Sequence, residues 1–146
     1  MFSGPFQEAK IIENVGGVLN LIVFLALTLG WAMYGYQMSL GIKAFYDKFN
    51  ISHTGTIIGG FVGSFACAAV VMHILILIRG AEGAWYLFVY FVVQAGIATM
   101  LSYRTVKAQI AIDEGVKYTA EPIVGPLIFG AAYAFLLLNM QDILYP

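Results

Sequence analysis

Four long apolar segments without acidic residues take up most of this chain of 146 residues: 15–36, 54–78, 84–101 and 122–140. Each has close to the ~20 residues that a helix needs to cross the hydrocarbon core of a bilayer, which is about 30 Å thick. Lipid offers no water to satisfy backbone N–H and C=O groups, so spanning segments of this kind must be helical. The sequence therefore predicts an all-α integral membrane protein, folded as a four-helix bundle.

Composition supports lipid as the solvent of this chain. Hydrophobic residues make up 61% of it and charged residues 10%, whereas a soluble domain carries about 25% charged residues. A soluble fold of this length could not bury so much apolar surface. The net charge is −1, which gives nucleic acid no electrostatic attraction, so we expect no nucleic-acid partner. We expect one domain, 1–146, whose partners are the lipid bilayer and other membrane proteins or a second copy.

Short connections predict antiparallel, up-and-down spans. Only 79–83 separates the second span from the third, so we expect these two helices to be antiparallel neighbours. The segment 37–52 mixes apolar and charged residues; either the first helix runs on past the membrane, or this piece lies along the interface. The first span ends in aromatic residues that are typical of the headgroup level: Trp31, Tyr34 and Tyr36.

Lys and Arg are distributed unevenly between the two sides of such a bundle. With four crossings, Lys10 and Arg79 share the side of both termini. The other side carries five basic residues: Lys43, Lys48, Arg104, Lys107 and Lys117. Because Lys and Arg are enriched in cytoplasmic loops, we expect the first and third loops to face the cytoplasm or matrix and both termini to lie on the outer side. A plasma or vesicle membrane and the mitochondrial inner membrane both fit.

Small residues recur at every fourth position of the second span. They form two neighbouring rows, Gly55, Gly59, Gly63 and Cys67 in the first and Gly60, Ser64 and Ala68 in the second. In lipid, small residues let two helix backbones approach closely. We predict a helix-packing interface here, either with another protein or a second copy, or within the bundle. The candidate internal partners are two small pairs at the same spacing: Ala95 with Thr99, and Gly130 with Ala134.

Polar side chains within the spans are the other candidates for a functional site. His73 is ionisable, which makes it a functional candidate by default in a membrane. His53 precedes it by 20 residues, or about 30 Å of helix, so a haem at His73 would need a ligand from a partner chain. A neutral, hydrogen-bonded His73 near the interface is the expected state. The remaining polar candidates are Gln94, Asn20 and Asn139.

Groups that would carry catalysis do not occur together in this sequence. It has no nucleophile paired with a base, no phosphate-binding glycine loop and no paired acids, so we expect no enzyme activity, no catalytic residue and no metal site. The four spans contain no carboxylate, which a proton or cation transporter would use. The single cysteine, Cys67, excludes an intrachain disulfide. We expect no cofactor apart from bound lipid.

Three stretches carry a resemblance to a known family: the short link 79–83 (RGAEG), the opening of the second span at 55–60 (GTIIGG), and 130–135 (GAAYAF) in the fourth. Together with a length of about one four-helix unit, they make the layout similar to that of MARVEL-type tetraspan membrane proteins. The resemblance implies a role in membrane organisation without catalytic residues. It also implies that both termini are cytoplasmic, which is opposite to the orientation that the Lys and Arg distribution favours.

These observations favour a non-enzymatic structural or interaction role, namely membrane organisation or assembly through the glycine-rich second span. The alternative is an accessory subunit of a large energy-transducing membrane complex, since minimal loops and a small-residue face suit a chain that packs against a larger core. A small haem-binding electron-transfer anchor that uses His73 is a further alternative.

Overall fold

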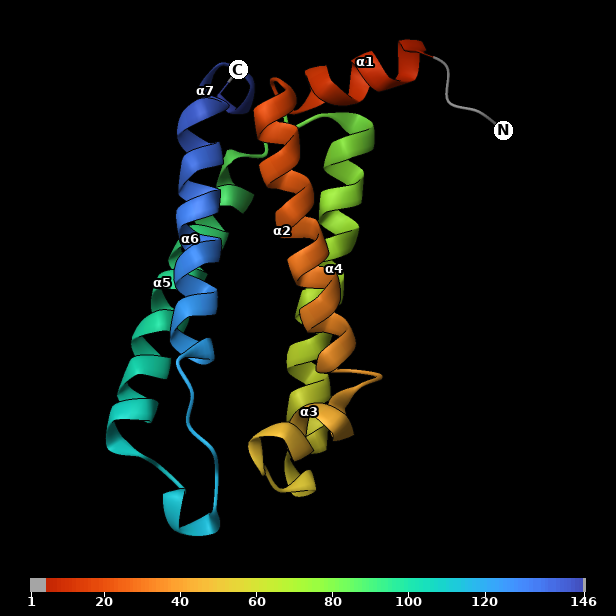
Figure 1. The fold of residues 1–146 in the computed structure, drawn as a ribbon. Helices are drawn as coiled ribbons and strands as arrows, with labels where there is room; N and C mark the ends of the chain where they lie inside the picture. The colour runs from red at the N-terminus through yellow and green to blue at the C-terminus, as the bar shows by residue number, and fades with distance from the viewer. Residues whose placement is uncertain (1–4, 146) are drawn as a thin grey trace.

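A computed structural model describes residues 5–145. Four helices in it are long and apolar enough to cross a membrane: α2 (Val18–Gln37), α4 (Thr56–Arg79), α5 (Trp85–Ala108) and α6 (Glu121–Asn139). They run up and down in turn (Figure 1), and the described residues contain no strand. The predicted fold class is confirmed, and the chain is a multi-pass membrane protein.

Short helices cover the two ends of this bundle. At one end lie α1 (Pro5–Asn14) and α7 (Gln141–Leu144), and at the other lies α3 (Ile42–Phe49) (Figure 1). Two single-turn 3₁₀ helices complete the fold, η1 (His53–Gly55) and η2 (Ile112–Glu114). The long helices are therefore left bare along their middle sections, where a bilayer would surround them.

Two helix boundaries differ by three or more residues from the predicted spans. The first spanning helix begins at Val18 rather than at residue 15, because Gly16 and Gly17 have φ angles of 72° and 124°. Glycine tolerates these angles and an α-helix does not contain them. The third spanning helix continues past residue 101 to Ala108, so its last turns protrude toward the η2 end.

The helices pack as two pairs. α2 lies along α4, α5 lies along α6, and α2 also contacts α6, which gives the order α4–α2–α6–α5 (Figure 1). The prediction that the second and third spans pack as neighbours is therefore wrong. The link at 79–83 makes α4 and α5 antiparallel, but small residues decide which backbones approach closely. Gly63 of α4 lies against the end of α2, and Gly130 of α6 lies against α5.

The segment after α2 turns back instead of extending that helix. α3 packs beneath the ends of α2 and α4, with Ile42, Tyr46 and Phe49 buried. The Tyr46 hydroxyl donates a hydrogen bond to the carbonyl of Gly55 at 2.9 Å, which ties α3 to the start of α4. Of the two alternatives for 37–52, a continuous first helix is thus wrong.

Polar contacts tie neighbouring segments together at both ends of the bundle, and those at the α3 end reach from one helix pair to the other. At the α1 end, the Asn14 amide donates to the Leu77 carbonyl at 2.7 Å, and the Ala81 N–H donates to the Asn14 carbonyl at 3.1 Å. At the α3 end, Lys48 forms an ion pair with Glu121 at 3.0 Å. Since that pair is exposed, it contributes little to stability. These contacts hold the ends together while the middle of the bundle depends on its core.

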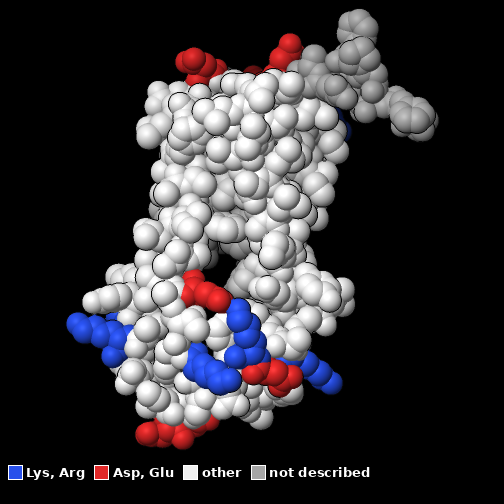
Figure 2. All heavy atoms as spheres, in the orientation of Figure 1, with Lys and Arg blue, Asp and Glu red and all other residues white. Residues whose placement is uncertain are grey.

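Charged residues occur at the two ends of the molecule and leave an uncharged band between them. In Figure 2, Lys and Arg gather over the α3 and η2 end, and the band above it on this face is white. The sequence places Lys43, Lys48, Arg104, Lys107 and Lys117 in this region. An uncharged band bounded by charges is the surface expected of a protein that crosses a bilayer.

Candidate functional site

His73 lies at the centre of the bundle, with 1% of its surface exposed. Its Nδ1 atom is 2.8 Å from the Thr28 hydroxyl of α2, and its Nε2 atom is 2.8 Å from the Tyr133 hydroxyl of α6. The Trp31 indole N–H donates to the same Tyr133 oxygen. A chain of hydrogen bonds, Trp31–Tyr133–His73–Thr28, therefore connects α2, α6 and α4; we call it the His73 network.

The direction of each hydrogen bond in the His73 network follows from counting hydrogens. The Thr28 hydroxyl donates its one hydrogen to the Phe24 carbonyl at 2.8 Å, so it accepts from Nδ1–H of His73. A neutral imidazole then has a bare Nε2, which accepts the Tyr133 O–H. The Tyr133 oxygen in turn accepts the Trp31 N–H, which is only a donor. Each polar hydrogen in the chain has an acceptor.

The other neutral tautomer of His73 leaves one polar hydrogen of the network without an acceptor. If Nε2 carried the hydrogen, the Tyr133 oxygen would accept from both His73 and Trp31, and its own hydrogen would have no acceptor in the described part of the chain. A buried donor without a partner is costly. The geometry thus favours the neutral, Nδ1-protonated form, held between two hydroxyl groups.

Aromatic rings enclose the His73 network and bring in the fourth spanning helix. The Phe24 ring lies 4.4 Å from the His73 ring, centroid to centroid. Phe91 of α5 stacks on Tyr133 at 4.6 Å with an interplanar angle of 15°. Phe88 of α5 is buried against the same ring at 6.2 Å. This apolar enclosure lowers the local dielectric, which strengthens the hydrogen bonds inside it.

A ligating role for His73 does not fit this geometry. Both imidazole nitrogens are engaged, so an iron would have to displace Tyr133 or Thr28. His53 lies at the far end of α4, exposed, with Nε2 2.8 Å from Asp47. The described residues contain no group of three or more His, Cys, Asp or Glu side chains that could hold a metal. His73 is better suited to holding helices together than to binding a ligand.

The first small-residue row of α4 faces the α2–α3 segment. A Cβ atom added to Gly63 would lie 2.6 Å from the Met38 carbonyl oxygen, and one added to Gly59 would collide with the Tyr46 hydroxyl. Gly55 approaches the same Tyr46 ring. The residues predicted as internal partners of this row were wrong. Ala95 of α5 and Gly130 of α6 instead face each other, and a Cβ atom added to Gly130 would lie 3.0 Å from the Cβ atom of Ala95.

The second small-residue row faces away from the bundle. Gly60 has no atom within 4 Å of an added Cβ, and Ser64 and Ala68 are exposed. The Ser64 hydroxyl donates to the carbonyl of its own helix at Phe61. Cys67 is exposed at the edge of the α2–α4 contact, where its sulfur lies 3.1 Å from an added Cβ on Gly35. We call Gly60, Ser64 and Ala68 the outer α4 face.

The remaining polar candidates lie apart from the His73 network. Asn20 is buried, and its amide donates to the Gly16 carbonyl at 3.2 Å, which supports the start of α2. Asn139 is exposed at the end of α6. Gln94 is half-buried at the middle of α5. These three side chains do not converge on a shared site.

Sequence reasoning missed the partners of His73. Trp31 was expected among the headgroups, but its indole points into the bundle and bonds to Tyr133. One signal could have found it: Thr28 and Trp31 are three residues apart and so share a helix face. Tyr133 gave no such signal, because a tyrosine in an apolar segment suits a helical core as well as a membrane interface.

No protein-family model, curated protein or solved structure matches this chain. The resemblance to MARVEL-type tetraspan proteins therefore stays a prediction.

Proposed function

We propose that this protein is a non-enzymatic structural component of its membrane, which presents a rigid four-helix scaffold to other membrane proteins. One observation carries the proposal: the hydrogen-bonding capacity of His73 is used entirely inside the bundle, between Thr28 and Tyr133. A histidine that served transport or electron transfer would need a ring nitrogen that is free or that can exchange its hydrogen-bond partner. In this bundle the ionisable group instead fixes three helices relative to one another.

The outer α4 face supports an assembly role for the second span. Gly60, Ser64 and Ala68 leave a shallow strip on the lipid-facing side of α4, flanked by the exposed rings of Phe61 and Phe65. Small residues in such a strip allow the backbone of a second helix to approach closely. This is membrane organisation through helix–helix contact, which is also the role that the MARVEL-type resemblance implies.

Gly60→Leu tests this assembly role without disturbing the fold. Because nothing lies within 4 Å of the Gly60 position, the variant should fold normally but lose close contact with a partner helix, weakening association about ten-fold. Complexes extracted from native membranes in mild detergent would be sized by native mass spectrometry. Val71→Leu, at another exposed position of α4, is the matched control. An unchanged complex in Gly60→Leu, or a wild-type protein that travels alone, contradicts the role.

An accessory subunit of a large energy-transducing complex is the second candidate. The gathering of Lys and Arg at the α3 and η2 end favours it, because termini on the outer side agree with this candidate and disagree with the MARVEL-type layout. The same extraction separates the two candidates: co-migration with redox or ATPase subunits supports the accessory subunit, and smaller assemblies support membrane organisation.

A further inference from the structure

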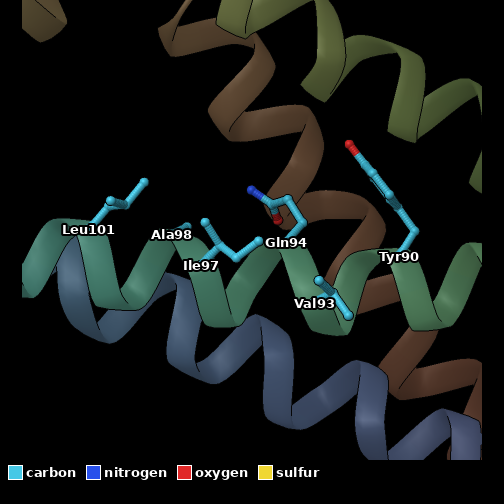
Figure 3. A pocket seen from close by; sticks show the side chains of 6 residues that line it. All are labelled: Tyr90, Val93, Gln94, Ile97, Ala98 and Leu101. Atoms are coloured by element: carbon cyan, nitrogen blue, oxygen red, sulfur yellow. The ribbon is translucent and has the colours of Figure 1, made fainter.

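A groove runs along α5 on the side where α5 lacks a packed neighbour. Its volume is about 320 Å³. Six α5 residues line it: Tyr90, Val93, Gln94, Ile97, Ala98 and Leu101. Figure 3 shows Tyr90, Gln94 and Leu101 pointing away from α6. The groove exists because α4 pairs with α2 rather than with α5.

The polar group in this groove lies at the depth of the bilayer centre. Gln94 is nine residues from Trp85 and nine from Tyr103, so it is about 14 Å from each aromatic end of the span. In the described part of the chain its amide makes no hydrogen bond to another residue; the side chain is half-buried, and its amide atoms reach the molecular surface. Lipid offers only hydrocarbon at this depth, so an acyl chain could fill the groove but could not satisfy the amide.

We propose that the groove receives α5 of a second copy, and that the two Gln94 amides exchange a pair of hydrogen bonds at the bilayer centre. A primary amide is both donor and acceptor, and is therefore complementary to itself. A two-fold axis along the membrane normal brings the two copies of Gln94 to the same depth. The inference rests on the proposed assembly role and names one partner for it.

The residues around Gln94 have the spacing of a helix–helix contact. Tyr90, Gln94, Ile97 and Leu101 follow one another at intervals of four, three and four residues, the pattern of knobs-into-holes packing. Tyr90 is 54% exposed, and Ile97 and Leu101 are each 50% exposed. An apolar stripe of this kind with one polar residue at its centre aligns two helices in a single register.

Energy transfer between labelled copies tests this dimer in vesicles. Purified protein, labelled at the exposed Cys67, would be reconstituted into phosphatidylcholine vesicles over a range of protein-to-lipid ratios. Gln94→Leu is expected to weaken dimerisation about ten-fold. The control is Thr99→Val, which removes a hydroxyl that already bonds to the Ala95 carbonyl of its own helix. A monomeric wild type, or equal association of the wild type and Gln94→Leu, overturns the proposal.

Cross-linking tests the same contact while Gln94 stays intact. In a Cys67→Ser background, Ile97→Cys should form a disulfide between copies on mild oxidation. Met100→Cys, exposed on α5 but outside the groove, should cross-link at least ten-fold more slowly. Equal cross-linking at the two positions contradicts the dimer. If the pure protein is monomeric while native membranes yield a Gly60-dependent assembly, only the dimer is wrong; if neither association occurs, the assembly role is wrong as well.

Discussion

Gly63→Leu is expected to lower the free energy of unfolding by about 3 kcal/mol. A Cβ atom at this position would lie 2.6 Å from the carbonyl oxygen of Met38 and 2.8 Å from its carbonyl carbon. These are backbone atoms at the end of α2, which cannot rotate away as a side chain does. The α2–α4 pair would have to separate along its length, losing the contacts on which helix association in lipid depends.

Gly60→Leu is the matched control, because it adds the same side chain to the same helix in open space. Reversible unfolding in mixed detergent micelles, followed by loss of helical circular dichroism, gives both free energies. Gly59→Leu should fall between them, since its obstructions are the ends of the Tyr46 and Ile42 side chains rather than backbone atoms. Equal unfolding midpoints for Gly63→Leu and Gly60→Leu would show that the two small-residue rows do not differ as described.

His73→Leu is expected to lower the free energy of unfolding by about 2 kcal/mol. The substitution removes both hydrogen bonds of the imidazole and leaves the Tyr133 O–H without its acceptor. It also removes the ring that packs at 4.4 Å from Phe24. His53→Leu, which alters an exposed histidine at the end of the bundle, should change stability by less than about 0.5 kcal/mol.

A double-mutant cycle with Tyr133→Phe isolates the hydrogen bond between the two side chains. Removing the Tyr133 hydroxyl after His73 has been lost should cost less than removing it from the wild type, by about 1 kcal/mol. The unfolding measurements would be made on all four proteins under one set of conditions. Strictly additive losses would mean that His73 and Tyr133 act independently, which contradicts the His73 network.

The spans could be predicted closely from sequence because lipid imposes one requirement on every residue in them. Helix ends at Gln37, Arg79 and Asn139 lie within about one residue of the predicted limits, a difference no larger than the uncertainty of any helix assignment. The start of α2 was displaced by Gly16 and Gly17, whose positive φ angles depend on local packing. Apolar character alone does not show that a glycine pair delays the start of a helix.

Helix pairing could not be predicted, because the shortest loop does not set the closest contact. The link at 79–83 fixes only that α4 and α5 run in opposite directions. α4 packs against α2 because Gly63 lets its backbone approach that of Met38 closely. The sequence shows two small-residue rows on α4 with nearly the same composition. Which row faces inward depends on the α3 side chains that pack against it. The sequence left open whether 37–52 continues the first helix or forms a separate segment, so it could not show which row α3 would cover.

The candidate site was predicted in part. His73 stood out as an ionisable residue in a span, but the aromatic residues that complete its network have two ordinary roles. Trp31 and Tyr133 both suit a membrane interface or a helical core, since each has an apolar ring and one polar atom. Only their positions in three dimensions, with Tyr133 between Trp31 and His73, distinguish the two roles.

The sidedness of single cysteines tests most directly the central claim that four helices cross a bilayer. Cysteines would replace Lys10, Lys48, Glu82, Asp113 and Asp142, one at a time, in a Cys67→Ser background. Sealed vesicles would then be labelled with an impermeant maleimide before and after permeabilisation. Positions 10, 82 and 142 are expected to label from one side of the membrane and positions 48 and 113 from the other. Labelling of positions 48 and 82, or of 82 and 113, from the same side would contradict that claim.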